Sequence, residues 1–138
     1  MLVVGDVNST IACALVAVKK GIPVIHVEAG LRTYNVKSPF PEEFNRQVTS
    51  RIATFHFAPT KVSRQNLLDE KVSDNQIFVT GNTVIDALLS MLENARADVF
   101  SDIILKRMPF LKQEKSNIPR IILVTGHRRE NFGSGFEE

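Results

Sequence analysis

The sequence has little cysteine, no tryptophan and no long apolar run. Its one cysteine, Cys13, stands among Ala12, Ala14 and Leu15, which predicts a small buried side chain in a reducing compartment rather than a disulfide or a metal ligand. No segment approaches the roughly 18 apolar residues that a membrane span needs, and the start lacks the pattern of a secretion leader. We therefore expect a cytoplasmic protein with no membrane partner.

Charge of one sign is also lacking. The 17 lysines and arginines nearly balance the 15 aspartates and glutamates, the net charge is +2, and the basic residues are scattered along the chain. This distribution provides no basic stripe for nucleic acid, so no nucleic-acid partner is expected. The 43% hydrophobic content over 138 residues is enough for the core of a globular domain.

The common motifs of cofactor and metal sites are missing. There is no G-x-G-x-x-G after a strand, no phosphate-binding G-x-x-x-x-G-K-[ST] loop and no serine in a nucleophile elbow. The histidines, His26, His56 and His127, do not have the i, i+4 spacing of metal ligands. We expect neither metal nor cofactor, and we interpret His56 as a strand residue with a hydrogen-bond partner.

Short apolar runs alternate with helical patterns along the chain. The runs, rich in β-branched and aromatic residues, predict strands at Met1–Val4, Ile22–Val27, Thr54–Ala58, Gln76–Thr80 and Arg120–Thr125. The helical patterns cover Asn8–Lys20, Glu42–Ala53, Thr60–Glu70 and Thr83 to about Arg96. Strands that alternate with helices predict an α/β fold with a parallel, Rossmann-like sheet whose helices flank both faces.

The pattern changes after residue 86. A long helix, a charged segment around Asp98–Arg107 and a linker-like stretch from Lys112 to Pro119 follow, and a new strand begins near Arg120. We predict part of one Rossmann-like domain over residues 1–86, a connection over 87–119 and the start of a second domain over 120–138. Because the chain opens inside a strand and closes inside a new unit, we expect a fragment.

Polar residues follow three of the predicted strands, where ligands bind in open parallel sheets. They are Gly5 and Asp6 after the first strand, His26, Glu28, Gly30 and Arg32 at the end of the second, and Gly126, His127, Arg128, Arg129 and Glu130 after the last. Singly, each has an ordinary explanation as a turn residue or a solvated charge. Together they predict a site at one edge of the sheet.

The carboxylates near the start of one predicted helix are a second indication of a functional site. Glu42 and Glu43 follow Pro41 at a helix start, where capping alone would explain them, and Arg46 lies four residues after Glu42, as in a surface ion pair. If Asp6, Glu28 and Glu42 converge instead, their mutual repulsion would raise the pKa of one or more of them into a range useful for proton transfer. Arginines and a helix N-terminus would suit a pyrophosphate.

Five ordered motifs resemble those of the non-hydrolysing UDP-N-acetylglucosamine 2-epimerases: Gly5–Asp6, His26–Arg32, Pro41–Arg46, Thr80–Leu88 and Thr125–Phe132. The resemblance covers essentially the whole chain. It implies a cytoplasmic homodimer with two Rossmann-like domains in the GT-B arrangement, which binds UDP-sugar between them. It also implies interconversion of UDP-N-acetylglucosamine and UDP-N-acetylmannosamine for cell-envelope polysaccharide synthesis, by elimination and readdition of UDP without a nicotinamide.

The resemblance also assigns roles to residues. It places the acid and base carboxylates at Asp6, Glu28 and Glu42 and the catalytic histidine at His127. The expected substrate-binding residues are His26, Arg32, Arg46, Arg128, Arg129 and Glu130. A regulatory UDP-sugar site, to which Glu42 could contribute, is a further hypothesis.

The chain departs from the family in length. Members begin with a glycine-turn segment that helps to hold UDP and continue through most of a second domain with an Asp-Ser-Gly-Gly segment, and these parts are absent here. We therefore expect the polypeptide alone to be inactive or nearly so. Two alternatives stay open: a non-catalytic UDP-sugar-binding or subunit-interaction module, and a relative of the hydrolysing epimerases or GT-B glycosyltransferases.

Overall fold

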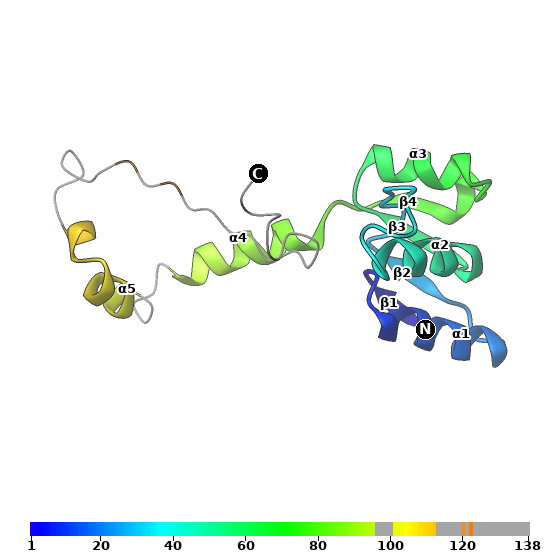
Figure 1. Cartoon of the computed structure of the whole chain (residues 1–138), viewed down its shortest axis with the longest axis horizontal. Coiled ribbons are helices and arrows are strands. Elements are labelled where there is room, and N and C mark those ends of the chain that lie inside the picture. The colour runs from blue at the N-terminus through cyan, green and yellow to red at the C-terminus, as the bar shows by residue number, and fades with distance from the viewer. Residues whose placement is uncertain (96–100, 113–119, 121, 123–138) are drawn as a thin grey trace. The chain divides into compact units, whose positions relative to one another are not determined.

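The computed structural model describes residues 1–95, 101–112, 120 and 122 of the chain (Figure 1). The chain divides into two units, Met1–Thr83 and Val84–Glu138, and each is described by itself. The predicted domain boundaries at residues 86 and 119 stay a prediction.

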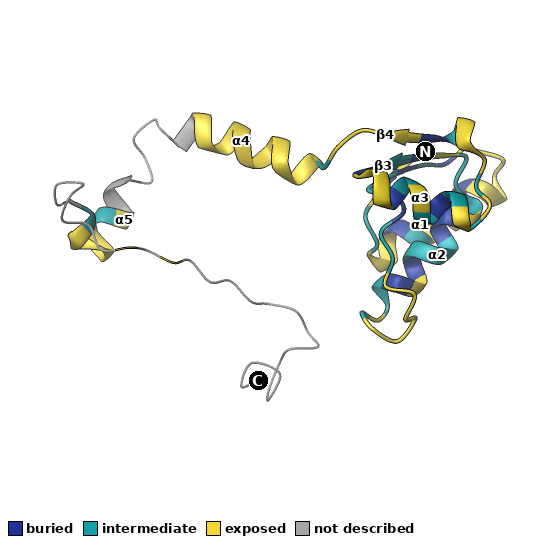
Figure 2. Ribbon diagram, turned by 90° about the horizontal axis from the view of Figure 1, so that it is seen from above, coloured by how far each residue is buried: buried dark blue, intermediate teal, exposed yellow. Residues whose placement is uncertain are grey.

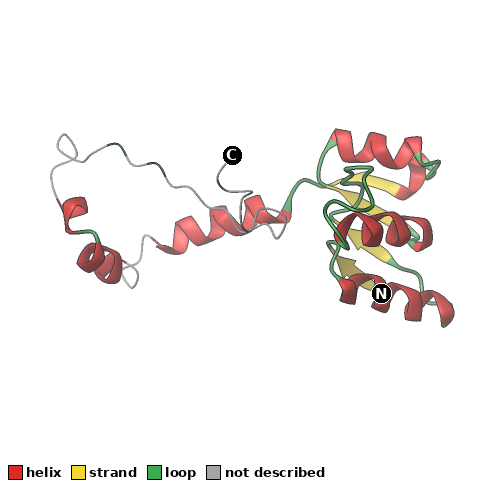
Figure 3. Cartoon of the chain, in the orientation of Figure 1, coloured by secondary structure: helices red, strands yellow, loops and turns green. Residues whose placement is uncertain are grey.

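The first unit contains a four-stranded parallel sheet (Figure 3). The strands lie in chain order: β1 (Leu2–Val4), β2 (Ile25–Val27), β3 (Phe55–Ala58) and β4 (Ile77–Val79). Each falls inside a predicted strand, because β-branched and aromatic side chains fit a pleated, buried surface. The fifth predicted strand, Arg120–Thr125, lies almost entirely outside the described residues.

Three helices connect these strands, as the sequence predicts: α1 (Asn8–Lys19), α2 (Glu42–Ile52) and α3 (Lys61–Asp69). A short 3₁₀ turn, η1 (Asp74–Gln76), precedes β4. All three helices lie on one face of the sheet (Figure 2). The expectation of helices on both faces is therefore wrong for residues 1–83. The physical reason is the strand order: when strands follow the chain order without reversal, right-handed crossovers all fall on the same side.

The two faces of the sheet differ in exposure. We call the face beneath the helices the covered face; its register-aligned residues are buried: Val3, His26, His56 and Ile77. We call the opposite side the bare face; its exposed residues, between 39% and 57% accessible, are Leu2, Val4, Phe55 and Phe78. Two apolar clusters pack between the covered face and the helices. One lies around Ala14, Ala17 and Val24, and the other around Ala29, Ala58 and Leu67.

Cys13 is exposed, so the prediction that it is buried is wrong. Helix α1 turns Thr10, Ala14 and Ala17 inward, which leaves Cys13 on its outer side. There it lines an open apolar hollow of about 320 Å³ with Met1, Ala12, Val16, Ala17, Lys20 and Ile22. Because α1 is apolar around much of its circumference, its pattern does not show which side faces the sheet.

The second unit contains α5 (Ser101–Arg107) and a 3₁₀ turn, η2 (Pro109–Lys112), while α4 (Thr83–Ala95) begins at the last residue of the first unit. Helix α4 agrees with the prediction of a helix from Thr83 to about Arg96. Helix α5 lies where the sequence predicts only a charged segment. None of the helices in the described ranges is long and apolar enough to cross a membrane.

Candidate functional site

Asp6 and Glu28 lie at the carboxyl ends of the neighbouring parallel strands β1 and β2. Asp6 lies two residues after the end of β1, and a backbone hydrogen bond from Gly5 to the Val27 carbonyl (3.1 Å) continues the pairing of the two strands beyond β1. A Cβ atom at Gly5 would lie 3.6 Å from Glu28 Oε2, so the Glu28 carboxylate lies against the residue that precedes Asp6. Glu28 has a left-handed backbone, with φ of 66°, which is uncommon for a residue other than glycine. The convergence of the Asp6 and Glu28 carboxylates stays a prediction.

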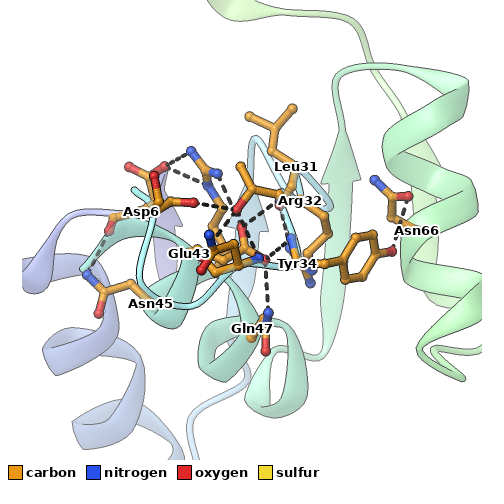
Figure 4. A network of polar contacts seen from close by, with 12 residues as sticks. Asp6, Leu31, Arg32, Tyr34, Glu43, Asn45, Gln47 and Asn66 are labelled. Atoms are coloured by element: carbon orange, nitrogen blue, oxygen red, sulfur yellow. Dashed lines mark hydrogen bonds and ion pairs between the residues drawn. The ribbon is translucent and has the colours of Figure 1, made fainter. Parts of the chain in front are cut away.

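Helix α2 holds Asp6 at two points (Figure 4). The Asp6 carboxylate meets Arg46 through a single oxygen, Oδ2, which accepts a hydrogen bond from Nε at 2.8 Å and forms an ion pair with Nη2 at 2.6 Å. The Asp6 backbone carbonyl accepts another hydrogen bond, from Asn45 Nδ2 at 2.8 Å. The same Asn45 nitrogen donates to Asn8 Oδ1, at the start of α1, over 3.0 Å. Asp6 is thus fixed through both its side chain and its backbone.

Arg46 has partners other than the one that the sequence suggests. Its Nη1 lies 3.4 Å from Glu43 Oε2, and its other contacts are with Asp6. The interpretation of Arg46 as the surface ion-pair partner of Glu42 is therefore wrong. Glu42 is the first residue of α2 and is half-buried, and its convergence with Asp6 and Glu28 stays a prediction.

Glu43 is completely buried, with 0% of its surface exposed. Each carboxylate oxygen accepts two hydrogen bonds: Oε1 from Gln47 Nε2 (2.9 Å) and the Tyr34 backbone (3.2 Å), Oε2 from the Thr33 backbone (3.0 Å) and Arg46. Burial raises the pKa of Glu43, but the hydrogen bonds from Gln47, Thr33 and Tyr34 and the charge of Arg32 together outweigh burial and lower this pKa below its ordinary value. Glu43 is therefore a buried anion at neutral pH.

Arg32 makes its contacts inside the protein. Its guanidinium, with 0% exposure, binds both carboxylate oxygens of Glu70 at 2.5 and 2.8 Å and donates to Ser50 Oγ at 2.8 Å and to the Leu31 carbonyl at 2.7 Å. These bonds join the loop after β2 to α2 and to the end of α3. The geometry favours a structural role for Arg32, and direct substrate contact stays a prediction.

His26 and His56 are paired in the register of β2 and β3, and each is only 1% exposed. His26 Nε2 donates to the Gly5 carbonyl over 2.9 Å, so this ring supports the turn that carries Asp6. Burial lowers the pKa of both rings, to about 4 for His56, where the charges of His26 and Arg32 add to the effect. Both Nδ1 atoms are buried without a hydrogen-bond partner, but a hydrogen bond to the Ala53 backbone gives the His56 ring the partner that the sequence interpretation expects.

The sequence interpretation missed the buried polar side of α2. Glu43, Asn45, Thr49 and Ser50 are buried, whereas Phe44, the residue that a hydrophobic pattern would place in the core, is 45% exposed. A signal was present in the sequence, because α2 lacks a continuous apolar stripe although it lies between two apolar strands. Such a helix packs through hydrogen bonds.

The other predicted site residues, His127, Arg128, Arg129 and Glu130, lie outside the described residues. Within residues 1–95 and the other described positions, no group of three or more His, Cys, Asp or Glu side chains could hold a metal ion. The described part of the site can supply carboxylates for proton transfer, with Arg46 against Asp6 and the buried His26 against the preceding Gly5 carbonyl.

Comparisons with known proteins identify the family. The family model described as UDP-N-acetylglucosamine 2-epimerase matches residues 1–138. The UDP-N-acetylglucosamine 2-epimerase of Escherichia coli (strain K12) is 52% identical over 139 aligned residues, which cover 100% of this chain and 36% of that protein. The Salmonella typhimurium (strain LT2) protein of the same name is 53% identical, over 99% of this chain and 36% of its own length. The chain thus spans about a third of the length of these curated relatives.

Solved structures of UDP-GlcNAc 2-epimerases also match this chain. The crystal structure of the Neisseria meningitidis UDP-GlcNAc 2-epimerase bound to UDP-GlcNAc has a TM-score of 0.87 and 46% identity, and the match covers 99% of this chain and 36% of that chain. The Methanocaldococcus jannaschii enzyme in complex with UDP-GlcNAc and UDP matches with a TM-score of 0.71 and 43% identity, over 77% of this chain and 29% of that chain. The predicted Rossmann-like α/β sheet of the GT-B type is confirmed. The chain belongs to the UDP-N-acetylglucosamine 2-epimerase family.

Proposed function

We propose that this chain is part of an enzyme that interconverts UDP-N-acetylglucosamine and UDP-N-acetylmannosamine. A base removes the proton from C2 of the sugar, the C1–oxygen bond to UDP breaks, and a C1=C2 double bond forms. The intermediates are 2-acetamidoglucal and UDP. Return of a proton to the other face of C2, with re-formation of the bond to UDP, inverts C2 without any net oxidation or reduction.

The observation that carries the proposal is that the Glu28 carboxylate lies against Gly5, the residue that precedes Asp6. Both carboxylates follow neighbouring parallel strands, at the sheet edge where ligands bind in such folds. The left-handed backbone of Glu28 costs on the order of 1–3 kcal/mol for a residue with a side chain, and such strain is found where function requires the residue. Two carboxylates at one edge suit a reaction in which one group removes a proton and another returns it.

The family supports the remaining roles in the proposal. In this proposal, Glu42 completes the set of carboxylates and His127 is the catalytic histidine. Arg46 in the described part, together with Arg128, Arg129 and Glu130, contacts the substrate, and the arginines stabilise the departing diphosphate. His26 and Arg32 support the loops that carry Asp6 and Glu28.

The complete enzyme, in this proposal, is a cytoplasmic homodimer of two-domain GT-B subunits that serves cell-envelope polysaccharide synthesis. Residues 1–86 belong to its first domain, 87–119 to the connection and 120–138 to its second domain. In this proposal the 138-residue chain by itself is inactive or nearly so, because it spans about a third of the length of its curated relatives.

A chimera tests the reaction. Residues 1–138 replace the matched region of the Neisseria relative, and the purified protein is incubated with UDP-N-acetylglucosamine in D₂O. We expect formation of UDP-N-acetylmannosamine and deuterium at C2, measured by proton NMR. Asp6→Asn and Glu28→Gln should each lower the rate by about 10²–10⁴-fold, the usual contribution of a general acid or base.

The products that the chimera forms distinguish the proposed epimerase from a hydrolysing enzyme and from a non-catalytic binding module. Release of free N-acetylmannosamine would identify a hydrolysing enzyme instead. A chimera that folds and binds UDP-N-acetylglucosamine but incorporates no deuterium would contradict the proposed function and favour a non-catalytic binding module.

A further inference from the structure

Glu43 has an unusual position for a carboxylate. It is fully buried, yet it lies in the first turn of α2 next to the half-buried Glu42. A buried charge is tolerated only when hydrogen bonds replace its hydration, and four donors surround this one. Since two donors occupy each oxygen and no surface reaches solvent, Glu43 cannot take a proton from a bound substrate.

Helix capping does not explain these contacts. A capping carboxylate binds the free backbone N–H groups of its own helix, but the backbone donors to Glu43 belong to Thr33 and Tyr34 in the loop after β2. The remaining donors are the side chains of Gln47, labelled in Figure 4, and of Arg46. Glu43 therefore joins α2 to the loop that follows Glu28.

Arg46 connects Glu43 to Asp6. Its Nη1 lies 3.4 Å from Glu43 Oε2, while Nε and Nη2 lie 2.8 and 2.6 Å from Asp6 Oδ2. Because the guanidinium is planar and its donors have fixed directions, an anchor at one nitrogen restricts the orientation of the others. The position of Glu43 thus determines how Arg46 meets Asp6.

We propose that Glu43 is a positioning residue: it holds Arg46 against Asp6 and ties the Thr33–Tyr34 backbone to α2, so that Asp6 is fixed for proton transfer. This inference rests on the proposed function for its consequence in catalysis. Its geometric part concerns this chain alone. Loss of the Glu43 charge frees Arg46 and displaces Asp6 without removing any group that touches the substrate.

The geometric part is tested on the 138-residue chain with Glu43→Gln. Glutamine keeps the shape of the side chain but lacks the negative charge that attracts Arg46. Its NH₂ group also replaces one of the two oxygens and therefore faces hydrogen-bond donors instead of accepting from them. We expect exchange of the Arg46 Nε–H with solvent, followed by ¹⁵N NMR, to become at least about tenfold faster, since this hydrogen bond opens more often. Unchanged exchange in a folded variant would overturn the proposal.

The catalytic part is tested in the chimera described above. For Glu43→Gln we expect kcat to fall about 10–100-fold with KM for UDP-N-acetylglucosamine within about threefold, because a small misplacement of a catalytic group affects mainly the chemical step. The matched control is Thr60→Ala, which removes the side-chain cap of α3 and lowers stability without contact to this cluster. Its kcat should not change. A loss in both variants in proportion to their melting temperatures would reduce Glu43 to a purely structural role.

A double-mutant cycle with Arg46→Lys then identifies the route. If Glu43 acts through Arg46, adding Glu43→Gln to Arg46→Lys lowers kcat much less than Glu43→Gln alone. Additive losses would show that Glu43 does not act through Arg46. An inactive parent chimera would count against the proposed function only, because the exchange measurement still decides whether Glu43 positions Arg46.

Discussion

The covered face and the bare face of the sheet are formed by the same four strands but have opposite character. The covered face carries two histidines at its centre, His26 and His56, and lies beneath helices that contribute many polar side chains. The bare face presents Leu2, Val4, Phe55 and Phe78, which have the composition of a buried surface. The more apolar face is thus the more exposed one. Apolar composition alone therefore does not reveal which face these helices cover.

The largest effect on stability is expected at the buried contacts of Arg32, which join the loop after β2 to α2 and to the end of α3. Arg32→Met should lower the free energy of unfolding by about 3–5 kcal/mol, because it leaves the partly buried Glu70 carboxylate without its partner. The exposed pair of Arg64 and Asp74 provides the control, and Arg64→Met should cost about 0–1 kcal/mol. Urea unfolding followed by circular dichroism measures both. Equal losses would show that burial does not distinguish the two pairs.

A similar loss is expected in the apolar cluster on the same side. Leu67 is fully buried in α3, so Leu67→Ala should cost about 2–5 kcal/mol through lost burial and the cavity left behind. Leu2→Ala, on the bare face, makes the same chemical change at a residue 57% exposed and should cost well below about 1 kcal/mol. If both variants lose the same stability, the two faces do not differ in packing.

Acid should lower the free energy of unfolding through the buried histidines of the covered face. Since the pKa of His56 is lowered from 6.5 to about 4 in the fold, the unfolded chain binds more protons between these values. Stability is therefore complete above pH 6.5 and falls as the pH drops towards 4, by up to about 3 kcal/mol from His56. His26, whose pKa is also lowered by burial, acts in the same direction.

The variant His56→Phe isolates this contribution from that of the carboxylates, which titrate in the same range. Its stability, measured by urea unfolding between pH 7 and 4, should decrease less with acid than that of the original chain. An unchanged pH dependence would mean that His56 is protonated in the folded protein at pH 5.

The smallest effect on stability is expected on the bare face. Phe78 is 45% exposed and its ring centroid lies 6.2 Å from that of Phe55 and 5.7 Å from that of Phe57. Phe78→Ser should cost no more than about 1.5 kcal/mol, the order of the lost aromatic pairs, and should reduce hydrophobic-dye binding and self-association. A loss above about 3 kcal/mol would place Phe78 in the core.

The sequence predicted the regular elements well where local patterns decide them. The apolar runs around His26 and His56 and the helical pattern from Asn8 to Lys20 gave elements that agree with the structure to within a few residues. The site was predicted less fully. Asp6 and Glu28 could be selected as candidates because residues just after parallel strands lie at the same edge of a sheet. Glu43 and Asn45 were not identified, because their roles depend on partners up to 39 residues away in sequence.

Sequence alone thus determined the strand and helix order, the parallel sheet and the family, since each depends on local periodicity or on motifs that can be read along the chain. Only the tertiary structure decided which face of the sheet the helices cover, that Cys13 is exposed, and that Arg46 pairs with Asp6 and Glu43 rather than with Glu42. These features depend on crossover direction and on contacts between distant residues. No local pattern of side chains contains that information.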